Sequence, residues 1–439
     1  MKIHLVAILL FCFCAHTALA QVRPLTLNEA IAASLQNNYD IQLSRNDSLL
    51  ATLNNSYARY AFFPRVNASG GILQNRTTQL QILKDTTRGG KVRTTNASAS
   101  INLNWTLFDG FRMFITRRRL GELVALSELQ IKAQVVNTVA NVMRTYYDIV
   151  RQEQQLKAIE EQMALSGERL KLAQYRFDIG VGVKPDVLQA RIDLNGQRSA
   201  LLTQQTAIAN LKETLNQLLV LPVGNQFVVA DTSISFNTGL VLDSVRSGIG
   251  ATNPDLLLAQ QNLVIADLLL QERRAERYPT VEFNSAYNFN QTKNQNVINP
   301  ITQPLLNRNA GLNYGLTATI PIFNGYATRR NIQAAQLDIQ FQQLQYERSL
   351  ATINTGLATS YANYDLSKRA LALEEENIIL VRENIFIARE RYRLGVATFL
   401  EMRTAEQSLA DAQFRLIQAR FNTKVAEIEL MRLRGDLVN

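Results

Sequence analysis

The side chains that most often carry catalytic chemistry are confined to the first few residues of this sequence. The chain has 439 residues with two histidines and two cysteines, and all four stand within the first sixteen positions, at His4, Cys12, Cys14 and His16. Later positions therefore supply no imidazole as a general base and no thiolate as a nucleophile. This distribution excludes Ser-His-Asp and Cys-His catalysis, the common zinc sites and disulfides from the rest of the chain.

Carboxylates are the remaining candidates, either for hydrolysis or for a metal site with oxygen ligands only. Both uses need two acids that converge in one cleft, whereas the acids of this chain are scattered along segments with helical periodicity. We therefore expect no enzymatic activity, no catalytic residue, no cofactor and no metal site.

The first twenty residues have the pattern of a secretory signal peptide. Lys2 supplies the positive charge, residues 6–13 are apolar, and Ala18-Leu19-Ala20 has the spacing of a cleavage site. Cleavage after Ala20 would leave 419 residues without histidine or cysteine. Export of the chain argues against nucleic-acid binding, although its formal net charge is +9. No later apolar run reaches the roughly 18 residues of a transmembrane helix.

The sequence is one unit written twice, with a constant offset of 215 residues. The residues that keep this register include Asn38 and Asn253, Pro64 and Pro279, Phe108 and Phe323, Gly110 and Gly325, and Gly180 and Gly395. A period of this length indicates a duplicated domain rather than a solenoid repeat. We expect a first repeat over 21–221, a linker over 222–241 that packs around the middle of the molecule, and a second repeat over 242–439.

Each repeat contains a long proline-free segment with coiled-coil spacing, over 111–179 and 326–394. In the second segment Leu371, Ile378, Ile385 and Tyr392 recur every seven residues, as they do in helices that pack along a seam. In the first, the corresponding apolar positions are Leu156, Ile159, Met163, Leu170, Ala173 and Phe177, with Ser166 as the one polar member. A glycine ends each segment and another helix follows it. We therefore expect two antiparallel helical hairpins, with tips at about 180–185 and 395–400.

Between the helical segments the period becomes two, with apolar residues alternating with serine, asparagine and threonine. This alternation predicts strands at about 65–75 and 96–108 in the first repeat, and at about 280–291 and 310–323 in the second, joined by polar loops. Strands of this length with one apolar and one small polar face are typical of an outer-membrane β-barrel with a water-filled lumen. Lipid tolerates only a closed sheet and four strands are too few, so several copies must pool their hairpins.

The order of four short motifs resembles the TolC family of outer-membrane efflux proteins, also called outer-membrane factors. The motifs are Asn253-Pro254-Asp255, Tyr278-Pro279, Pro321-Ile322-Phe323-Asn324-Gly325 and Tyr392-Arg393-Leu394-Gly395. The resemblance implies a mainly α protein that forms a homotrimer, with a twelve-stranded membrane β-barrel continued by a periplasmic α-helical tunnel. It also implies a place in the outer membrane of a Gram-negative bacterium.

The same resemblance implies a passive exit duct of a tripartite efflux or type I secretion system. The duct would be opened by a periplasmic adaptor (membrane fusion) protein and an inner-membrane pump of the RND or ABC type. In this family the hairpin tips meet the adaptor. Here the tips are Gly180, Val181, Gly182 and Val183, and Gly395, Val396, Ala397 and Thr398.

Asp186 and Glu401 occupy the same repeat position, six residues after each tip glycine. An acid there complements the dipole of the helix that begins after the tip, and several copies would also form a ring that attracts cations. Both interpretations stay open. By resemblance, Tyr392 of one hairpin should hydrogen-bond the acid at Asp186 on a neighbouring hairpin and hold the entrance shut. The best-known member of this family has an arginine and a further acid where this chain has Ala397 and Thr404, so a different way of closing the entrance stays open.

The main alternative is a periplasmic coiled-coil scaffold or adaptor protein without a pore. Such a protein would keep the heptads but would have no use for four amphipathic strands. The polar side chains at the tips and in the expected lumen are generic, and they predict no particular cargo.

Overall fold

A computed structural model describes residues 24–83, 86–237, 239–298 and 304–437. The expected signal peptide lies outside the described residues. The chain divides into two compact units. The strand unit is formed by the described residues within Asp47–Glu128 and Leu258–Glu347, and the helical unit by the described residues within Met1–Asn46, Leu129–Leu257 and Arg348–Asn439.

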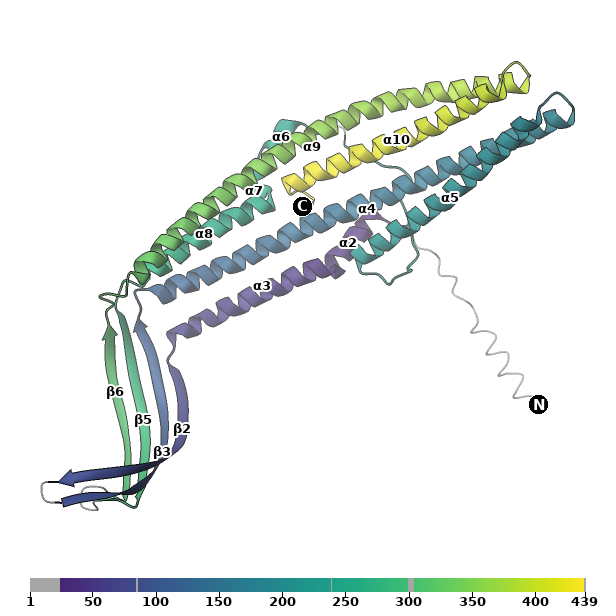
Figure 1. Cartoon of the computed structure of the whole chain (residues 1–439). Coiled ribbons are helices and arrows are strands. Elements are labelled where there is room, and N and C mark those ends of the chain that lie inside the picture. The colour runs from purple at the N-terminus through teal and green to yellow at the C-terminus, as the bar shows by residue number, and fades with distance from the viewer. Residues whose placement is uncertain (1–23, 84–85, 238, 299–303, 438–439) are drawn as a thin grey trace, which may run out of the picture. The chain divides into compact units, whose positions relative to one another are not determined.

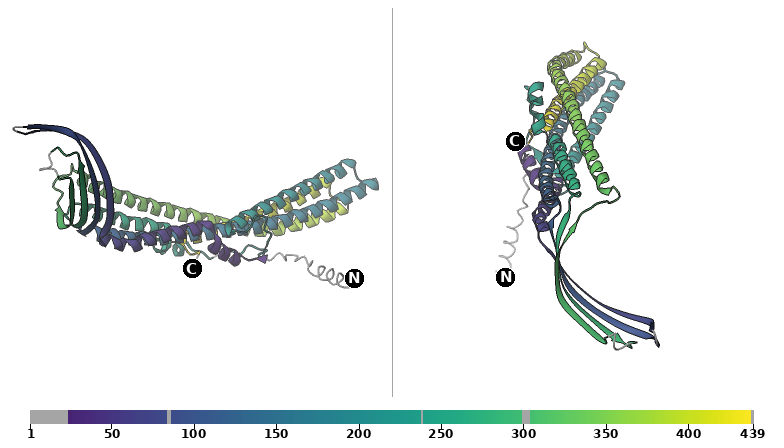
Figure 2. Two further views of the ribbon diagram at one scale, coloured as in Figure 1. Left: turned by 90° about the horizontal axis from the view of Figure 1, so that it is seen from below. Right: turned by 90° about the vertical axis from the view of Figure 1, so that its left-hand side faces the viewer.

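The strand unit contains one antiparallel sheet of four strands in the order β2-β3-β5-β6. These are β2 (Arg65–Leu83), β3 (Thr86–Phe108), β5 (Thr280–Gln295) and β6 (Leu306–Thr319). Figures 1 and 2 show the four strands side by side, with the far end of the β2–β3 hairpin bending away from β5 and β6. The two repeats meet where β3 pairs with β5. Among the described residues β2 and β6 each pair on one side only.

The strand register gives the sheet one apolar and one polar face. Along one row Ala68 pairs with Ile101, Ile101 with Tyr287 and Tyr287 with Leu312. The next row joins Ser69, Ser100, Asn288 and Gly311, and the hydroxyls of Ser69 and Ser100 lie 2.8 Å apart. Because neighbouring residues of a strand point to opposite faces, the alternation seen in the sequence is carried across all four strands.

The strand limits expected from the alternation need correction. Three of the four strands reach beyond the expected limits: β2 continues to Leu83, β3 begins at Thr86, and β5 continues to Gln295. Much of the expected polar loop is therefore a β-ladder, because backbone hydrogen bonds between strands form whatever the polarity of the side chains. The fourth strand lies earlier than the expected 310–323, over Leu306–Thr319. Pro321 lies just beyond its end and has no N–H to donate to a ladder.

The helices also show the duplication. α4 (Arg112–Asp178) and α9 (Ala327–Arg393) have 67 residues each, while α5 (Lys184–Leu219) and α10 (Phe399–Arg434) have 36 each. The other helices are α2 (Leu27–Asn37), α3 (Tyr39–Ala58), the 3-10 helix η1 (Arg59–Phe62), α6 (Leu242–Arg246), α7 (Ile249–Thr252) and α8 (Pro254–Ala275). None of the helices in the described ranges is long and apolar enough to cross a membrane.

The core of the helical unit includes the segment that links the repeats. Tyr146 is fully buried there, and its hydroxyl donates to the carbonyl of Leu25 over 3.0 Å. Phe227, Val229 and Ile234 pack into the same core, and β4 (Val228–Val229) pairs in parallel with β1 (Pro24–Leu25). The residues of the expected linker thus take part in the packing of the helices.

Two buried asparagines at equivalent repeat positions connect the starts of α3 and α8 to the ends of α5 and α10. The amide of Asn38 donates to the carbonyl of Leu218 over 3.1 Å, and that of Asn253 donates to the carbonyl of Leu433 over 2.8 Å. The carbonyl oxygens of both asparagine side chains accept hydrogen bonds from the first turn of the next helix. Asparagine at both positions thus satisfies backbone groups that a helix end leaves unpaired.

Candidate functional site

The two hairpin tips in the helical unit have the same backbone conformation. Gly180 has φ +76° and Gly395 has φ +78°, a left-handed conformation that glycine adopts without strain. At the first tip the N–H of Val181 donates to the carbonyl of Arg176, and at the second Val396 donates to Arg391, each over 3.0 Å. The duplication therefore extends to the hydrogen bonds that close each turn.

The tips differ at two positions, where the first has Gly182 and Val183 and the second has Ala397 and Thr398. A Cβ atom on Gly182 would lie 2.8 Å from the backbone nitrogen of Phe177, which is too close. At the second tip the N–H of Ala397 is 3.2 Å from the carbonyl of Arg391, compared with 2.8 Å for Gly182 and Arg176. The second turn is thus slightly wider, and it buries the methyl group of Ala397 in the core that contains Tyr392.

The tips present apolar side chains to solvent. Val181, Val183, Val396 and Leu400 are all exposed. Beside the second tip, α9 and α10 enclose a cavity of about 520 Å³. Its lining includes Ile387, Arg391, Thr398, Leu400 and Glu401. An exposed apolar surface with a polar rim has the composition of a protein-docking site.

The two candidate acids occupy different environments. Thr398 caps α10, and its hydroxyl oxygen accepts the N–H of Glu401 over 3.1 Å. The Glu401 carboxylate in turn accepts a hydrogen bond from this hydroxyl and lies 3.8 Å from the Arg391 guanidinium. This geometry fits a helix-capping role for Glu401. Asp186 is half-buried in the first turn of α5 and forms no ion pair with any described residue.

Tyr392 is buried at the second tip and contacts Arg176 from the first hairpin. The Arg176 guanidinium lies 5.0 Å from the centre of the Tyr392 ring and donates to the Tyr392 carbonyl over 3.3 Å. Burial raises the pKa of the Tyr392 hydroxyl, Arg176 opposes this shift and Asp186 adds to it. Within the described part of one chain, no hydrogen bond joins Tyr392 to Asp186. At Tyr392 the first hairpin instead contributes Arg176.

A second connection between the hairpins consists of charged residues that the sequence patterns did not single out. Arg169 on α4 is 3% exposed and Glu406 on α10 is 1% exposed. One nitrogen of the Arg169 guanidinium lies 2.8 Å from the Glu406 carboxylate, and another lies 2.8 Å from that of Asp193 on α5. Arg403 contacts the same Asp193 oxygen over 3.1 Å. We call Arg169, Asp193 and Glu406, together with Arg403 on the exposed side of Asp193, the buried charge cluster.

Glu406 is the member of this cluster whose carboxylate lacks hydrogen bonds to other described residues. Although Arg169 is close, neither Glu406 carboxylate oxygen has a hydrogen-bond partner with suitable geometry among the described residues. Burial raises the pKa of Glu406 to about 7, and Asp193 adds to this effect, whereas Arg169 and Arg389 oppose it. The carboxyl is therefore poised to exchange a proton near neutral pH.

The described residues contain no group of three or more acids, histidines or cysteines placed to hold a metal ion. What the geometry does show is a pair of helical hairpins with exposed tips, and a sheet whose faces differ in polarity. Strands that alternate an apolar and a small polar face are typical of outer-membrane channel proteins, and in this chain they are combined with long paired helices.

The sequence matches the family described as outer membrane efflux protein over residues 30–220 and 247–436. The chain therefore belongs to this family, as the resemblance to the TolC family indicated, and two matched segments are what a duplicated sequence would give. Membership places the chain among outer-membrane proteins, in a family whose work is transport rather than catalysis.

Individual relatives share modest identity with the chain over most of their length. The chain is 21% identical to the outer membrane efflux protein BepC of Brucella suis biovar 1, across 93% of this chain and 85% of the relative. It is 26% identical to Protein CyaE of Bordetella pertussis, across 87% and 77%. Its fold is similar to that of the outer membrane protein VceC from Vibrio cholerae, with a TM-score of 0.77, 16% identity and coverage of 93% and 96%.

Proposed function

We propose that three copies of this chain form a passive exit duct in the outer membrane. Their twelve strands would close into one barrel, with the apolar face of the sheet toward lipid and the polar face toward a water-filled lumen. The observation that carries this proposal is the sheet itself. Among the described residues it has two edge strands that pair on one side only, and it has an exposed apolar face. A membrane-inserted sheet must close to satisfy such edges.

The helical unit supports pooling of several copies. On α9 the side chains of Leu366, Leu373, Leu380 and Ile387 recur every seven residues and are all exposed. The buried heptad of Leu371, Ile378 and Ile385 lies elsewhere on the helix surface. A second exposed heptad on a helix whose first heptad is already packed indicates a further helix partner, which neighbouring copies would supply. A pore-free scaffold would leave the apolar sheet face unexplained.

The exposed tips are the proposed docking site for a periplasmic adaptor, through Val181, Val183, Val396 and the cavity beside Leu400. An inner-membrane pump of the RND or ABC type would supply the energy, because a passive duct performs no work of its own. Relatives are named for toluene efflux and for toxin and drug export. Because these substrates differ, family membership does not identify the substrate of this chain.

Purified full-length protein is expected to run as a trimer by native mass spectrometry in detergent and to produce discrete conductance steps in a planar lipid bilayer. Membrane fractions should release it with detergent but not with high salt, since a barrel is held by the hydrophobic effect. A monomer that is extracted by salt and conducts no ions would contradict the proposed duct and would favour the scaffold.

Arg176→Gln is expected to raise the open probability of the channel. The substitution removes a charged hydrogen bond and a cation–π contact with Tyr392, together worth about 1–2 kcal/mol. If this contact favours the closed tips, its loss shifts the closed-to-open ratio by about tenfold per copy. Single-channel recording measures this directly, with Arg198→Gln on the exposed surface of α5 as the control. An unchanged open probability in Arg176→Gln would show that the contact does not hold the entrance shut.

A further inference from the structure

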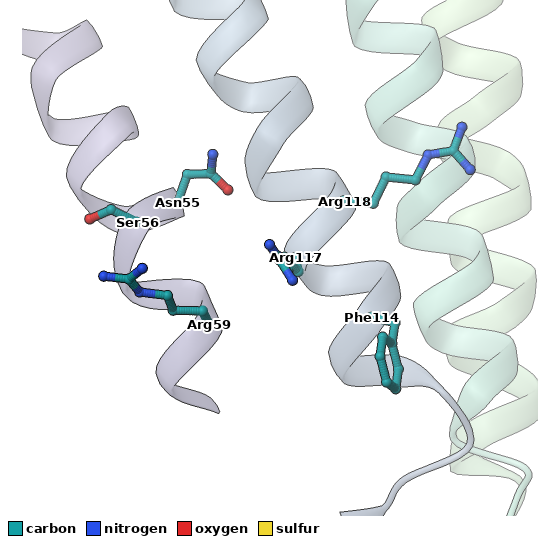
Figure 3. Close-up of a pocket in the computed structure, with 6 residues that line it drawn as sticks. All are labelled: Asn55, Ser56, Arg59, Phe114, Arg117 and Arg118. Atoms are coloured by element: carbon teal, nitrogen blue, oxygen red, sulfur yellow. The ribbon is translucent and has the colours of Figure 1, made fainter. Parts of the chain in front are cut away.

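A cavity of about 580 Å³ lies in the strand unit, where α3 gives way to the first strand and α4 begins. Figure 3 shows its six lining residues. Three come from α3 and the following 3-10 helix and three from the first turns of α4: Asn55, Ser56 and Arg59, and Phe114, Arg117 and Arg118. The lining thus contains three positive charges, two neutral hydrogen-bonding groups and no acid.

The three arginines have no counter-charge. Arg59, Arg117 and Arg118 form no ion pair with any described residue, and Arg59 donates only to the hydroxyl of Tyr60, over 3.2 Å. The adjacent Arg119 behaves differently, since its guanidinium lies 2.8 Å from the carboxylate of Glu272. All three arginines are exposed, so water and salt screen much of their mutual repulsion, and a bound anion would reduce it further. The cavity therefore fits a negatively charged group with several oxygen acceptors, which guanidinium groups bind well.

Two of the three arginines belong to the first repeat alone. The equivalents of Arg117 and Arg118 in the second repeat are Ile332 and Gln333, and Ile332 is buried, whereas Arg59 has Arg274 as its equivalent. Arg117 and Arg118 are therefore not required by the fold that the two repeats share, which leaves them free to serve a ligand of the first repeat.

Aromatic residues lie beside the lining residues in the sequence, and one of them, Phe114, lines the cavity itself. Tyr57, Tyr60, Phe63, Phe111 and Phe114 are large side chains that remain more than half or about half exposed. The rings of Phe62 and Phe114 lie 4.9 Å apart, and the Arg59 guanidinium lies 5.0 Å from the ring centre of Tyr60. Exposed aromatic rings beside cationic groups are typical of the boundary between lipid and water. A free inorganic anion would use the arginines but would have no use for these rings.

The position of the cavity relative to the sheet also suits an amphiphilic ligand. β2 begins at Arg65 and β3 ends at Phe108, so the cavity lies at the end of the sheet where its apolar face starts. An amphiphile with its charged group in the cavity could lay its apolar part over the aromatic rings and along that face.

We propose that this cavity binds the phosphate group of an anionic phospholipid, with the acyl chains over the neighbouring aromatic rings. The proposal rests on the proposed function, because it needs the sheet to lie in a membrane. The site would fix the depth of the barrel through one specific headgroup contact per copy.

The test uses full-length protein in nanodiscs of equal parts phosphatidylglycerol and phosphatidylcholine, with retained lipid counted by native mass spectrometry after release into detergent. The variant is Arg59→Gln with Arg117→Gln and Arg118→Gln. The control is Arg191→Gln with Arg198→Gln and Arg382→Gln, which removes the same charge from exposed helical positions. Phosphatidylglycerol retained by the variant is expected to fall by about tenfold, whereas the control keeps the level of the unsubstituted protein.

A second arm separates the two sources of phosphate. Inorganic phosphate at millimolar concentration should leave the retained phosphatidylglycerol in place. Complete displacement by phosphate would mean a simple anion site and would overturn the proposal. Equal retention of phosphatidylglycerol by the variant and the control would also overturn it. Conductance is recorded on the same samples. A variant that loses phosphatidylglycerol yet still conducts supports the lipid site and leaves the duct intact. An unsubstituted protein that retains no phosphatidylglycerol yet conducts overturns the lipid site alone.

Discussion

Replacing Arg169 by methionine is expected to destabilise the protein by about 3–5 kcal/mol at pH 8, the usual cost of removing one partner from a buried ion pair. Asp193 would keep its contact with Arg403 over 3.1 Å. Glu406 would keep none of comparable closeness, because Arg169 is the cation beside its carboxylate and both carboxylate oxygens already lack a well-aligned hydrogen bond. Thermal or urea unfolding followed by circular dichroism measures the loss.

The matched comparison is Glu406→Gln, which removes the buried charge and keeps the shape of the side chain. We expect Arg169→Met in the Glu406→Gln background to cost much less than Arg169→Met alone, because no buried carboxylate is then left without a counter-charge. Equal costs in the two backgrounds would mean that Arg169 contributes packing only, for example through its position over the Phe399 ring.

The pH dependence of the same group separates charge from packing in a second way. Burial raises the pKa of Glu406 from an ordinary 4.5 to about 7, so the folded protein holds a proton that the unfolded chain releases. The resulting stabilisation is fully present below pH 4.5 and is lost as the pH rises through about 7. The shift corresponds to about 3 kcal/mol between those limits, and Glu406→Gln should flatten this part of the stability profile. The penalty of Arg169→Met should shrink toward pH 5 for the same reason.

The apolar heptads predict the buried positions of α9 but miss the buried charge cluster on α4. The apolar heptad on α9 is confirmed, since Leu371, Ile378, Ile385 and Tyr392 are all buried. On α4 the expected seam was only partly right. Ile159, Ser166 and Ala173 are buried as expected. The other buried positions between 156 and 177 are Ala158, Gln162 and Arg169, whereas Met163 and Leu170 are only partly buried. An apolar pattern cannot identify a seam in which polar residues pair with one another across helices, because their partners lie far away in the sequence.

The strands and the tips show the same contrast: features set by neighbouring residues could be predicted, and features set by residues far away in the sequence could not. The alternating faces could be predicted because the period of two is a local property of a strand. The ends of β2 and β3 could not be predicted, because backbone hydrogen bonds to the opposite strand hold their polar residues in the sheet. Likewise the capping of α10 by Thr398 and Glu401 follows a short local pattern, whereas the contact between Arg176 and Tyr392 joins residues 216 positions apart.

Replacing Gly395 by tryptophan is expected to abolish efflux while leaving folded trimers in the membrane. A Cβ atom at this position would meet no atom within 4 Å, so the side chain can extend into solvent without disturbing the helices. Two consequences follow at the tip. The left-handed φ of +78° strains a residue with a Cβ by about 1–2 kcal/mol, and the indole would cover the apolar surface formed with Val396 and Leu400. Docking that depends on close fit at this surface would then fail.

The matched control is Gly395→Asn, because asparagine tolerates the left-handed conformation and adds little bulk. Efflux is measured as cargo accumulation in cells that lack the native copy, together with the amount of trimer in the outer membrane and its conductance in bilayers. We expect Gly395→Asn to retain most of the efflux and Gly395→Trp to lose it, with both proteins equally abundant and conducting. Normal efflux by an abundant Gly395→Trp protein would exclude the second tip from adaptor docking. Loss of efflux in both variants would assign the effect to the backbone of the turn, because asparagine leaves the docking surface open.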